Sequence, residues 1–156
     1  MSQKIVIETV DPCTPEVANV IARHLAMMQE NTPPESVHAL DLDGLRSPEV
    51  TFFALRLEGR VVGIGAVKDL GDGTGEVKSM HTVAEVRGNG IGDKLVEHAI
   101  THGRAAGMHA LLLETGAFEA HAPARALYAK HGFVPSGSFA DYGDDPHSAY
   151  MRRDLS

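Results

Sequence analysis

The sequence predicts a mixed α/β domain with a central, partly open sheet of about seven strands flanked by helices. Three apolar runs within residues 51–83 have the spacing of an antiparallel meander. A helical pattern and an apolar strand follow within residues 90–115 and imply a parallel crossover, because two parallel neighbours in one sheet are joined through a helix. Extended and helical patterns alternate along all 156 residues without a repeat or a linker, so we expect one domain, 1–156.

The meander begins with a hairpin. The runs at 51–57 and 60–70 are separated only by Glu58 and Gly59, which is typical of a tight turn. The sequence Gly-Asp-Gly-Thr-Gly at 71–75 then turns the chain into a third strand, expected at 76–83.

The segment before the meander predicts a strand and a helix. KIVIETV, residues 4–10, has the alternation of a strand. A helix is expected from Pro15 to about residue 30, with Thr14 as its N-cap. Residues 31–48 contain three prolines and predict a loop that carries a short helix.

The segment after the meander predicts the crossover and the end of the sheet. Residues 90–106 have the apolar stripe of an amphipathic helix. MHALLLET at 108–115 is nearly continuous in apolar residues, as expected for a strand buried on both faces. A further helix is expected at 122–131, with the last strands at Phe133 and 147–155.

Composition and charge argue against several classes of protein. Hydrophobic residues make up 43% and charged residues 22%, which is ordinary for a globular protein. The formal net charge of -7 disfavours binding to nucleic acid and suits a cationic or neutral substrate. No apolar run approaches the roughly 20 residues that span a bilayer. The start of the chain lacks the pattern of a signal peptide and Cys13 has no second cysteine to pair with, so we expect a cytoplasmic protein.

The most informative segment is MHTVAEVRGNGIGDKL, in which a strand ends and Gly88, Gly90 and Gly92 lead into a helix. Glycines let backbone N–H groups converge on an anion, and a helix N-terminus adds about half a positive charge, so this segment can hold a diphosphate. A nucleoside-triphosphate loop would need Lys-Ser or Lys-Thr where Asp93 and Lys94 stand. A dinucleotide fingerprint would read G-x-G-x-x-G after the first strand of a βαβ unit. The remaining alternative is an ordinary glycine-rich turn.

Two motifs carry a family resemblance. Arg87, Gly90 and Gly92 fit the pattern Q/R-x-x-G-x-G/A, and LYAKHGF at 127–133 matches a helix end usually written as LY followed by GF. On these motifs the chain resembles the GNAT superfamily of N-acetyltransferases along nearly its whole length. The segments HALDLDGLR, GEVKSMHT and ETGAFEAHAPARALY are similar to those of small bacterial members without an assigned substrate. The resemblance implies a mostly antiparallel sheet in which one parallel pair of strands splays apart.

The resemblance also implies acetyl-coenzyme A as the acetyl donor. In the family, its pantetheine arm hydrogen-bonds to the strand before the glycine loop, and its pyrophosphate is held by the loop. The corresponding positions are Met80, His81, Thr82 and Val83 for the pantetheine, and Arg87, Gly88, Asn89, Gly90, Ile91, Gly92 and Asp93 for the pyrophosphate. His121 falls where many members place an asparagine that contacts the cofactor, so it either contacts the pantetheine or caps the next helix. No metal is expected, because His98 and His102 are accompanied by neither an HExxH motif nor a cysteine pair.

The resemblance assigns the proton transfers to Glu76 and Tyr128. An alkylammonium, with a pKa near ~10, must lose a proton before its nitrogen can attack a thioester. Glu76 is the expected base, acting through a water, and Tyr128 is the expected acid that protonates the departing thiolate. From residue types alone, Glu76 could face solvent near a strand start, and Tyr128 could pack on the core.

The acceptor side of the site is less defined by the sequence. Glu114 interrupts an apolar strand, either as a pocket group or as a paired buried carboxylate. Acidic residues in expected loops could flank the site and attract an ammonium group; they are Asp41, Asp43, Asp141, Asp144 and Asp145. We therefore expect acetyl transfer to the primary amine of a small metabolite or amino-acid-like substrate. The alternatives are a protein N-terminus or lysine as acceptor, and a noncatalytic acyl-coenzyme A sensor; edge strands also make a homodimer an expectation.

Overall fold

The computed structural model describes residues 4–31, 42–117, 121–139 and 146–155. In that part of the chain, seven strands form one sheet in the order β1-β2-β3-β4-β5-β7-β6. The strands are β1 (Ile5–Thr9), β2 (Val50–Leu57), β3 (Arg60–Asp69), β4 (Thr74–Thr82), β5 (Ala110–Gly116), β6 (Val134–Ser136) and β7 (Ser148–Asp154). The helices are α1 (Pro15–Asn31), α2 (Leu42–Leu45), α3 (Ile91–Ala105) and α4 (Ala122–Lys130), with a 3-10 turn, η2 (Ala84–Val86). The expected sheet and its meander are confirmed.

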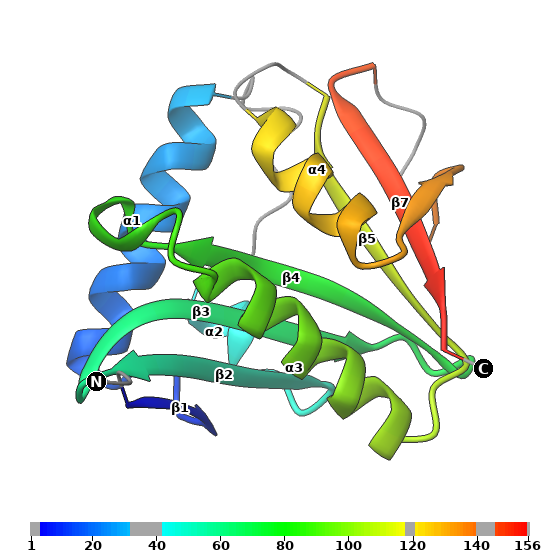
Figure 1. Cartoon of the computed structure of the whole chain (residues 1–156). Coiled ribbons are helices and arrows are strands. Elements are labelled where there is room, and N and C mark those ends of the chain that lie inside the picture. The colour runs from blue at the N-terminus through cyan, green and yellow to red at the C-terminus, as the bar shows by residue number, and fades with distance from the viewer. Residues whose placement is uncertain (1–3, 32–41, 118–120, 140–145, 156) are drawn as a thin grey trace.

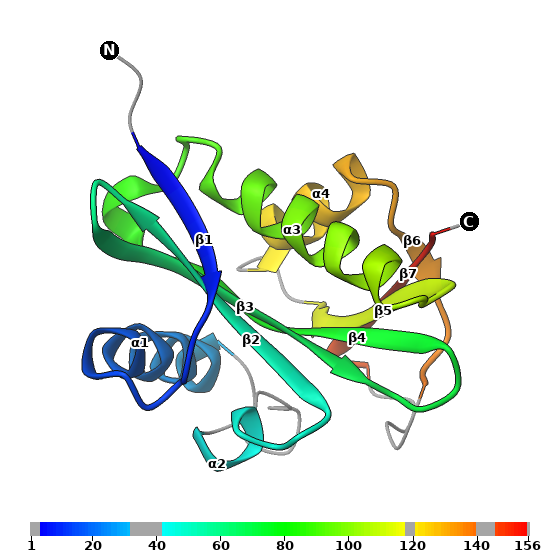
Figure 2. The same cartoon turned by 90° about the horizontal axis from the view of Figure 1, so that it is seen from below.

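Helices cover both faces of this sheet. Figure 2 shows α1 and α2 on one face and α3 and α4 on the other. The cause is the apolar stripe on each long helix: Val17 and Ile21 of α1 are buried, as are Leu95 and Val96 of α3. No helix within the described residues has the length and apolar character needed to cross a bilayer.

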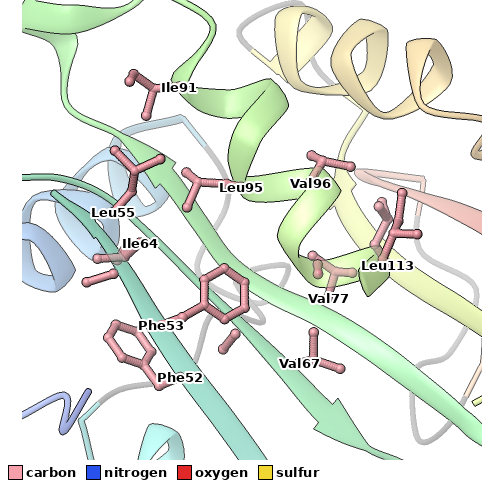
Figure 3. Close-up of a cluster of buried hydrophobic side chains, with 14 of the residues drawn as sticks. Phe52, Phe53, Leu55, Ile64, Val67, Val77, Ile91, Leu95, Val96 and Leu113 are labelled. Carbon is pink, nitrogen blue, oxygen red and sulfur yellow. The ribbon is translucent and has the colours of Figure 1, made fainter. Parts of the chain in front are cut away.

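The main core lies between α3 and the central strands. In Figure 3, Leu95 and Val96 of α3 lie over side chains of the sheet, among them Leu55 and Ile64. Phe53, Leu55 and Ile64 are 0% exposed. Fully burying a side chain of this kind contributes about 1.5–3 kcal/mol to folding, so this cluster holds the sheet against α3.

The sheet opens between its two parallel strands. β4 and β5 pair from Thr74 with Ala110 to Val77 with Leu113, and beyond that point β4 pairs only with β3 and β5 only with β7. Figure 1 shows the two strands diverging from their shared end near the C-terminus. The expected splayed parallel pair is therefore confirmed, and it leaves a V-shaped opening in the middle of the sheet.

A β-bulge in β4 marks the opening. Ser79 has a φ of 56°, and β4 has one more residue than β3 between the pairs Lys78 with Ala66 and His81 with Ile64. The bulge bends β4 at the point where it leaves β5. The divergence of the two strands thus has a local cause in the backbone of β4.

Candidate functional site

Two adjoining cavities meet at the V-shaped opening. The first, which we call the loop groove, has a volume of ≈ 450 Å³ and extends along β4 to the first turn of α3 and to α4. The second, which we call the inner cavity, has a volume of ≈ 80 Å³ and lies between α1, β4, β5 and α4. Within the described residues, β4 has no strand paired to its β5-facing edge after Val77. Backbone N–H and C=O groups of that edge can therefore bind a ligand that passes through the groove.

The loop between β4 and α3 permits close approach of an anion to the backbone. Gly88 (φ 87°) and Gly90 (φ 78°) are left-handed, and a Cβ at either position would project into open space. The Asn89 amide closes the loop by donating from Nδ2 to the Val86 carbonyl at 2.9 Å. α3 begins at Ile91, and the first N–H groups of a helix have no partner within it. Together with the partial positive charge of the helix N-terminus, this geometry fits a diphosphate.

Most residues predicted to bind the cofactor line the loop groove. They are Met80, His81, Thr82, Arg87, Gly88, Gly90, Ile91, Gly92, Asp93 and His121. The other two lie beside it. Val83 is 1% exposed and donates its N–H to the Val62 carbonyl at 2.9 Å, so it belongs to the core. Asn89 is exposed, and its side chain holds the loop closed.

His121 lies at the boundary between the two cavities. It is the N-cap residue of α4, but its side chain makes no capping hydrogen bond. The imidazole is 5% exposed and lies against Gly116, where an added Cβ would overlap the ring. It lines both the loop groove and the inner cavity. The alternative in which the His121 side chain caps α4 is therefore wrong.

Tyr128 also lines both cavities. Its ring is 7% exposed and packs against Phe133 with a centroid distance of 5.7 Å. Burial, and after it the charge of Glu114, raises the pKa of the Tyr128 phenol well above its ordinary value. The hydroxyl is therefore protonated near pH 7 and available as a hydrogen-bond donor. The alternative in which Tyr128 packs on the core is confirmed, and the residue also borders the two cavities; its role as the acid stays a prediction.

Glu76 is buried at the inner cavity. It is 3% exposed, so the alternative in which it faces solvent is wrong. Its Oε2 accepts a hydrogen bond from Lys78 Nζ at 2.9 Å, within a pair whose side chains are 4% and 8% exposed. Sequence reasoning missed Lys78, although residues two apart on a strand face the same side of the sheet. A charged residue at that spacing from the expected base was the available signal.

Two buried histidines pack beside the cavities. His24 of α1 and His81 of β4 lie with their Nδ1 atoms 3.3 Å apart. Burial, and after it the charge of His81, lowers the pKa of His24 to about 3. Burial, and after it the charge of Arg87, lowers the pKa of His81 to about 4. Sequence reasoning missed His24, although it continues the buried stripe that contains Val17 and Ile21.

Comparisons with known proteins agree with this arrangement. The sequence profile of the acetyltransferase (GNAT) family matches residues 17–133. The chain is 40% identical over 140 residues to YsnE of Bacillus subtilis, an uncharacterized N-acetyltransferase, covering 90% of this chain and 93% of YsnE. It is 46% identical over 124 residues to an IAA acetyltransferase of Azospirillum brasilense, covering 79% and 80% of the two chains. A solved structure from Klebsiella pneumoniae, provisionally described as an acyl-CoA N-acyltransferase, superposes with a TM-score of 0.83 at 32% identity, covering 97% and 98%.

The chain belongs to the acetyltransferase (GNAT) family. Members of the GNAT family use acetyl-coenzyme A, and this protein is an acetyl-coenzyme A-dependent acetyltransferase. The glycine loop, the start of α3 and the unpaired edge of β4 have the chemistry that such a donor needs: polarised N–H groups for a diphosphate and free backbone groups for the amides of a pantetheine arm.

Glu114, which the sequence predicts near the acceptor, lies at the inner cavity. The side chain is half-buried and lines the inner cavity beside Thr115, which agrees with the prediction of a pocket group. Asp41, Asp141, Asp144 and Asp145 lie outside the described residues, as does the side chain of Asp43 in α2. Within the described part of the chain, no three residues of the types His, Cys, Asp and Glu are grouped so that they could hold a metal ion.

Proposed function

We propose that this GNAT protein acetylates the primary amine of a small metabolite by direct attack in a ternary complex. One observation carries the proposal: Tyr128 borders both the loop groove and an inner cavity that is lined by the carboxylates of Glu76 and Glu114. A donor in the groove and an acceptor in the cavity would meet at this residue. The relative YsnE is named an N-acetyltransferase, which supports nitrogen as the accepting atom.

The donor is held mainly by backbone groups. N–H groups from Arg87 to Asp93 bind the pyrophosphate, and the edge of β4 from Met80 to Thr82 binds the pantetheine arm as an additional strand would. His121 contacts the arm near the thioester. The loop groove along β4, and the edge of β4 that no described strand pairs with after Val77, support this placement.

Glu76 and Tyr128 carry out the proton transfers. The acceptor enters as an ammonium ion and loses one proton to Glu76 through a water. Its nitrogen then attacks the thioester carbon, the C–N bond forms and the C–S bond breaks. Tyr128 donates its phenol proton to the departing sulfur, and the second proton of the nitrogen, passed on through water, restores the phenol. Holding amine and thioester together supplies much of the rate.

The size of the inner cavity favours a small acceptor over a protein N-terminus or a lysine side chain. A volume of ≈ 80 Å³, bordered by two strands and two helices, suits a compact amine better than a peptide chain. We also infer a cytoplasmic location, because Cys13 is an exposed free thiol and such thiols persist in reducing compartments.

The test is a screen for release of free thiol from acetyl-coenzyme A with amines, amino acids and peptides. Thiol release with small amines, together with an acetylated nitrogen in the product by mass spectrometry, would support the proposal. Turnover confined to peptides would indicate a protein acceptor, and a product cleaved by mild base would indicate a hydroxyl acceptor. Binding of acetyl-coenzyme A without release with any compound would favour the sensor alternative.

A further inference from the structure

The two strands that form the V-shaped opening carry opposite charges where they part. Val77 and Leu113 are the last residues through which β4 and β5 pair with each other. Lys78 and Glu114 are therefore the first residues on either side of the opening. Glu76, two residues before Lys78, faces the same side of β4. All three charged side chains line the inner cavity. The cavity therefore has an anion on one strand and an ion pair on the other.

The cation of this cavity is both buried and paired. The Lys78 side chain is 8% exposed, and its Nζ donates to Glu76 Oε2 at 2.9 Å. Burying an ammonium group is costly, and apolar side chains of similar size would form the same wall at lower cost. An ammonium group has three N–H donors, so Lys78 can bind an anionic ligand in addition to Glu76. A lysine at this position is therefore better explained by what it binds than by stability.

Neighbouring titratable groups do not reverse this charge pattern. His24 on α1 is neutral near pH 7, because burial lowers its pKa to about 3. Tyr128 on α4 is neutral as well, because burial raises the pKa of its phenol. The carboxylates of Glu76 and Glu114 and the ammonium of Lys78 then place charges of both signs on the described walls of the cavity. Such a cavity suits a ligand that itself carries both signs.

We propose that the acceptor is an α-amino acid, with its carboxylate bound by Lys78 and its amine held by Glu114 beside Tyr128. This inference rests on the proposed function, because it names the acceptor of the same site. The amine and carboxylate of an α-amino acid share one carbon, so they need an anion and a cation a short distance apart. β5 and β4 provide this pair where they begin to diverge.

The position of Glu114 also places the amine where it can react. Glu114 and Tyr128 both line the inner cavity. Tyr128 borders the groove that holds the donor, and an amine at Glu114 would therefore lie near the thioester. A simple amine lacks the carboxylate that Lys78 would bind, and a peptide N-terminus carries an amide in its place. The arrangement consequently discriminates among three kinds of acceptor.

The decisive experiment compares matched acceptors with the wild-type protein. Each L-amino acid in a panel is tested beside its decarboxylated amine and its carboxamide, by thiol release from acetyl-coenzyme A. The kcat/KM values are corrected for the fraction of unprotonated amine. We expect at least one amino acid to exceed both of its partners by about 10- to 100-fold, as for a charge-assisted hydrogen bond in a buried site.

The outcomes separate this inference from the proposed function. Equal or reversed preference throughout the panel would overturn the amino-acid acceptor while leaving acetyl transfer to amines intact. No thiol release with any compound would overturn both. Because this experiment uses only the wild-type protein, it does not depend on whether a variant folds.

A substitution then tests Lys78 itself. Lys78→Gln keeps a polar side chain without the charge, and should lower the ratio of amino-acid to amine kcat/KM by about 10- to 100-fold. The ratio is the readout because loss of Lys78 also alters the surroundings of Glu76 and so affects both rates. Lys68→Gln is the control: Lys68 is the cross-strand neighbour of Glu76 on β3, and it lines neither cavity. An unchanged ratio in Lys78→Gln would overturn the assignment of the carboxylate to Lys78.

Discussion

The loop groove and the inner cavity are built in different ways. The loop groove is lined largely by one continuous segment, from β4 through the glycine loop to α3, whose backbone groups can face a ligand. The inner cavity is formed by side chains from α1, β4, β5 and α4, which are far apart in the sequence. Backbone groups can bind a donor that all family members share, whereas side chains can vary to select an acceptor. Substitutions in the loop groove should therefore weaken binding of the donor, whereas substitutions in the inner cavity should change turnover or the choice of acceptor.

Gly90→Val should have the largest effect, and it should act on the loop groove alone. Gly90 has a φ of 78°, which valine rarely adopts, and the new side chain would project into the groove. We expect binding of coenzyme A to weaken by ~100-fold or more, measured by isothermal titration calorimetry.

Gly71→Val is the matched control for that change. Gly71 has a φ of 83°, also faces open space and lines neither cavity. It should suffer similar backbone strain, lose a similar amount of thermal stability, and keep its affinity for coenzyme A. Wild-type affinity in Gly90→Val would show that the diphosphate does not approach this loop.

Tyr128→Phe tests the point where the two regions meet. We expect turnover to fall by about 10- to 10³-fold, because the departing sulfur loses its proton donor. Affinity for coenzyme A should stay close to that of the wild type, since the contacts that we propose for the donor come mainly from the backbone. Tyr150→Phe is the control, because Tyr150 is also buried, at 9% exposure, but lines neither cavity. Unchanged turnover in Tyr128→Phe would remove the acid role.

Glu76→Gln tests whether a buried carboxylate of the inner cavity is catalytic or only structural. We expect kcat to fall by about 10- to 100-fold through loss of the base. The protein should also lose stability, by up to about 3–5 kcal/mol in the free energy of unfolding, because Lys78 keeps a buried charge without its partner. Adding Lys78→Met in the same chain should restore much of the stability, measured by urea denaturation, but not the turnover. Recovery of both stability and turnover in the double variant would show that the role of Glu76 is structural.

The same contrast explains what the sequence could predict. The loop groove follows from local rules, because Gly88 and Gly90 are adjacent in the chain to the helix they precede. The helices and strands of the fold also follow from local rules, because the periodicity of apolar residues is a property of each segment by itself. Glu76 and Tyr128 could be named from the family resemblance, and Glu114 from its place in an apolar strand, but their burial and partners depend on contacts between distant segments. The spacing of Lys78 from Glu76 places both side chains on one face of β4, but it does not show that this face is buried.

His24 illustrates that limit and provides the smallest predicted effect. In the unfolded chain an imidazole has a pKa of about 6.5, whereas burial lowers the pKa of His24 to about 3 and that of His81 to about 4. Above pH 6.5 both states are neutral at these sites and stability is complete. As the pH falls from 6.5 towards 4, the unfolded chain takes up protons that the folded protein does not, so the free energy of unfolding decreases.

His24→Leu should reduce that dependence. Removing one such site lowers the slope of the free energy of unfolding against pH by up to about 1.4 kcal/mol per pH unit. Urea denaturation between pH 5 and 6.5 measures it, in a range where most carboxylates are ionised in both states. His109→Gln is the control, since His109 is exposed and the slope should match that of the wild type. A wild-type slope in His24→Leu would mean that His24 is protonated to a similar extent in the folded and unfolded states. The pair with His81 would then not be a neutral, buried contact between α1 and β4.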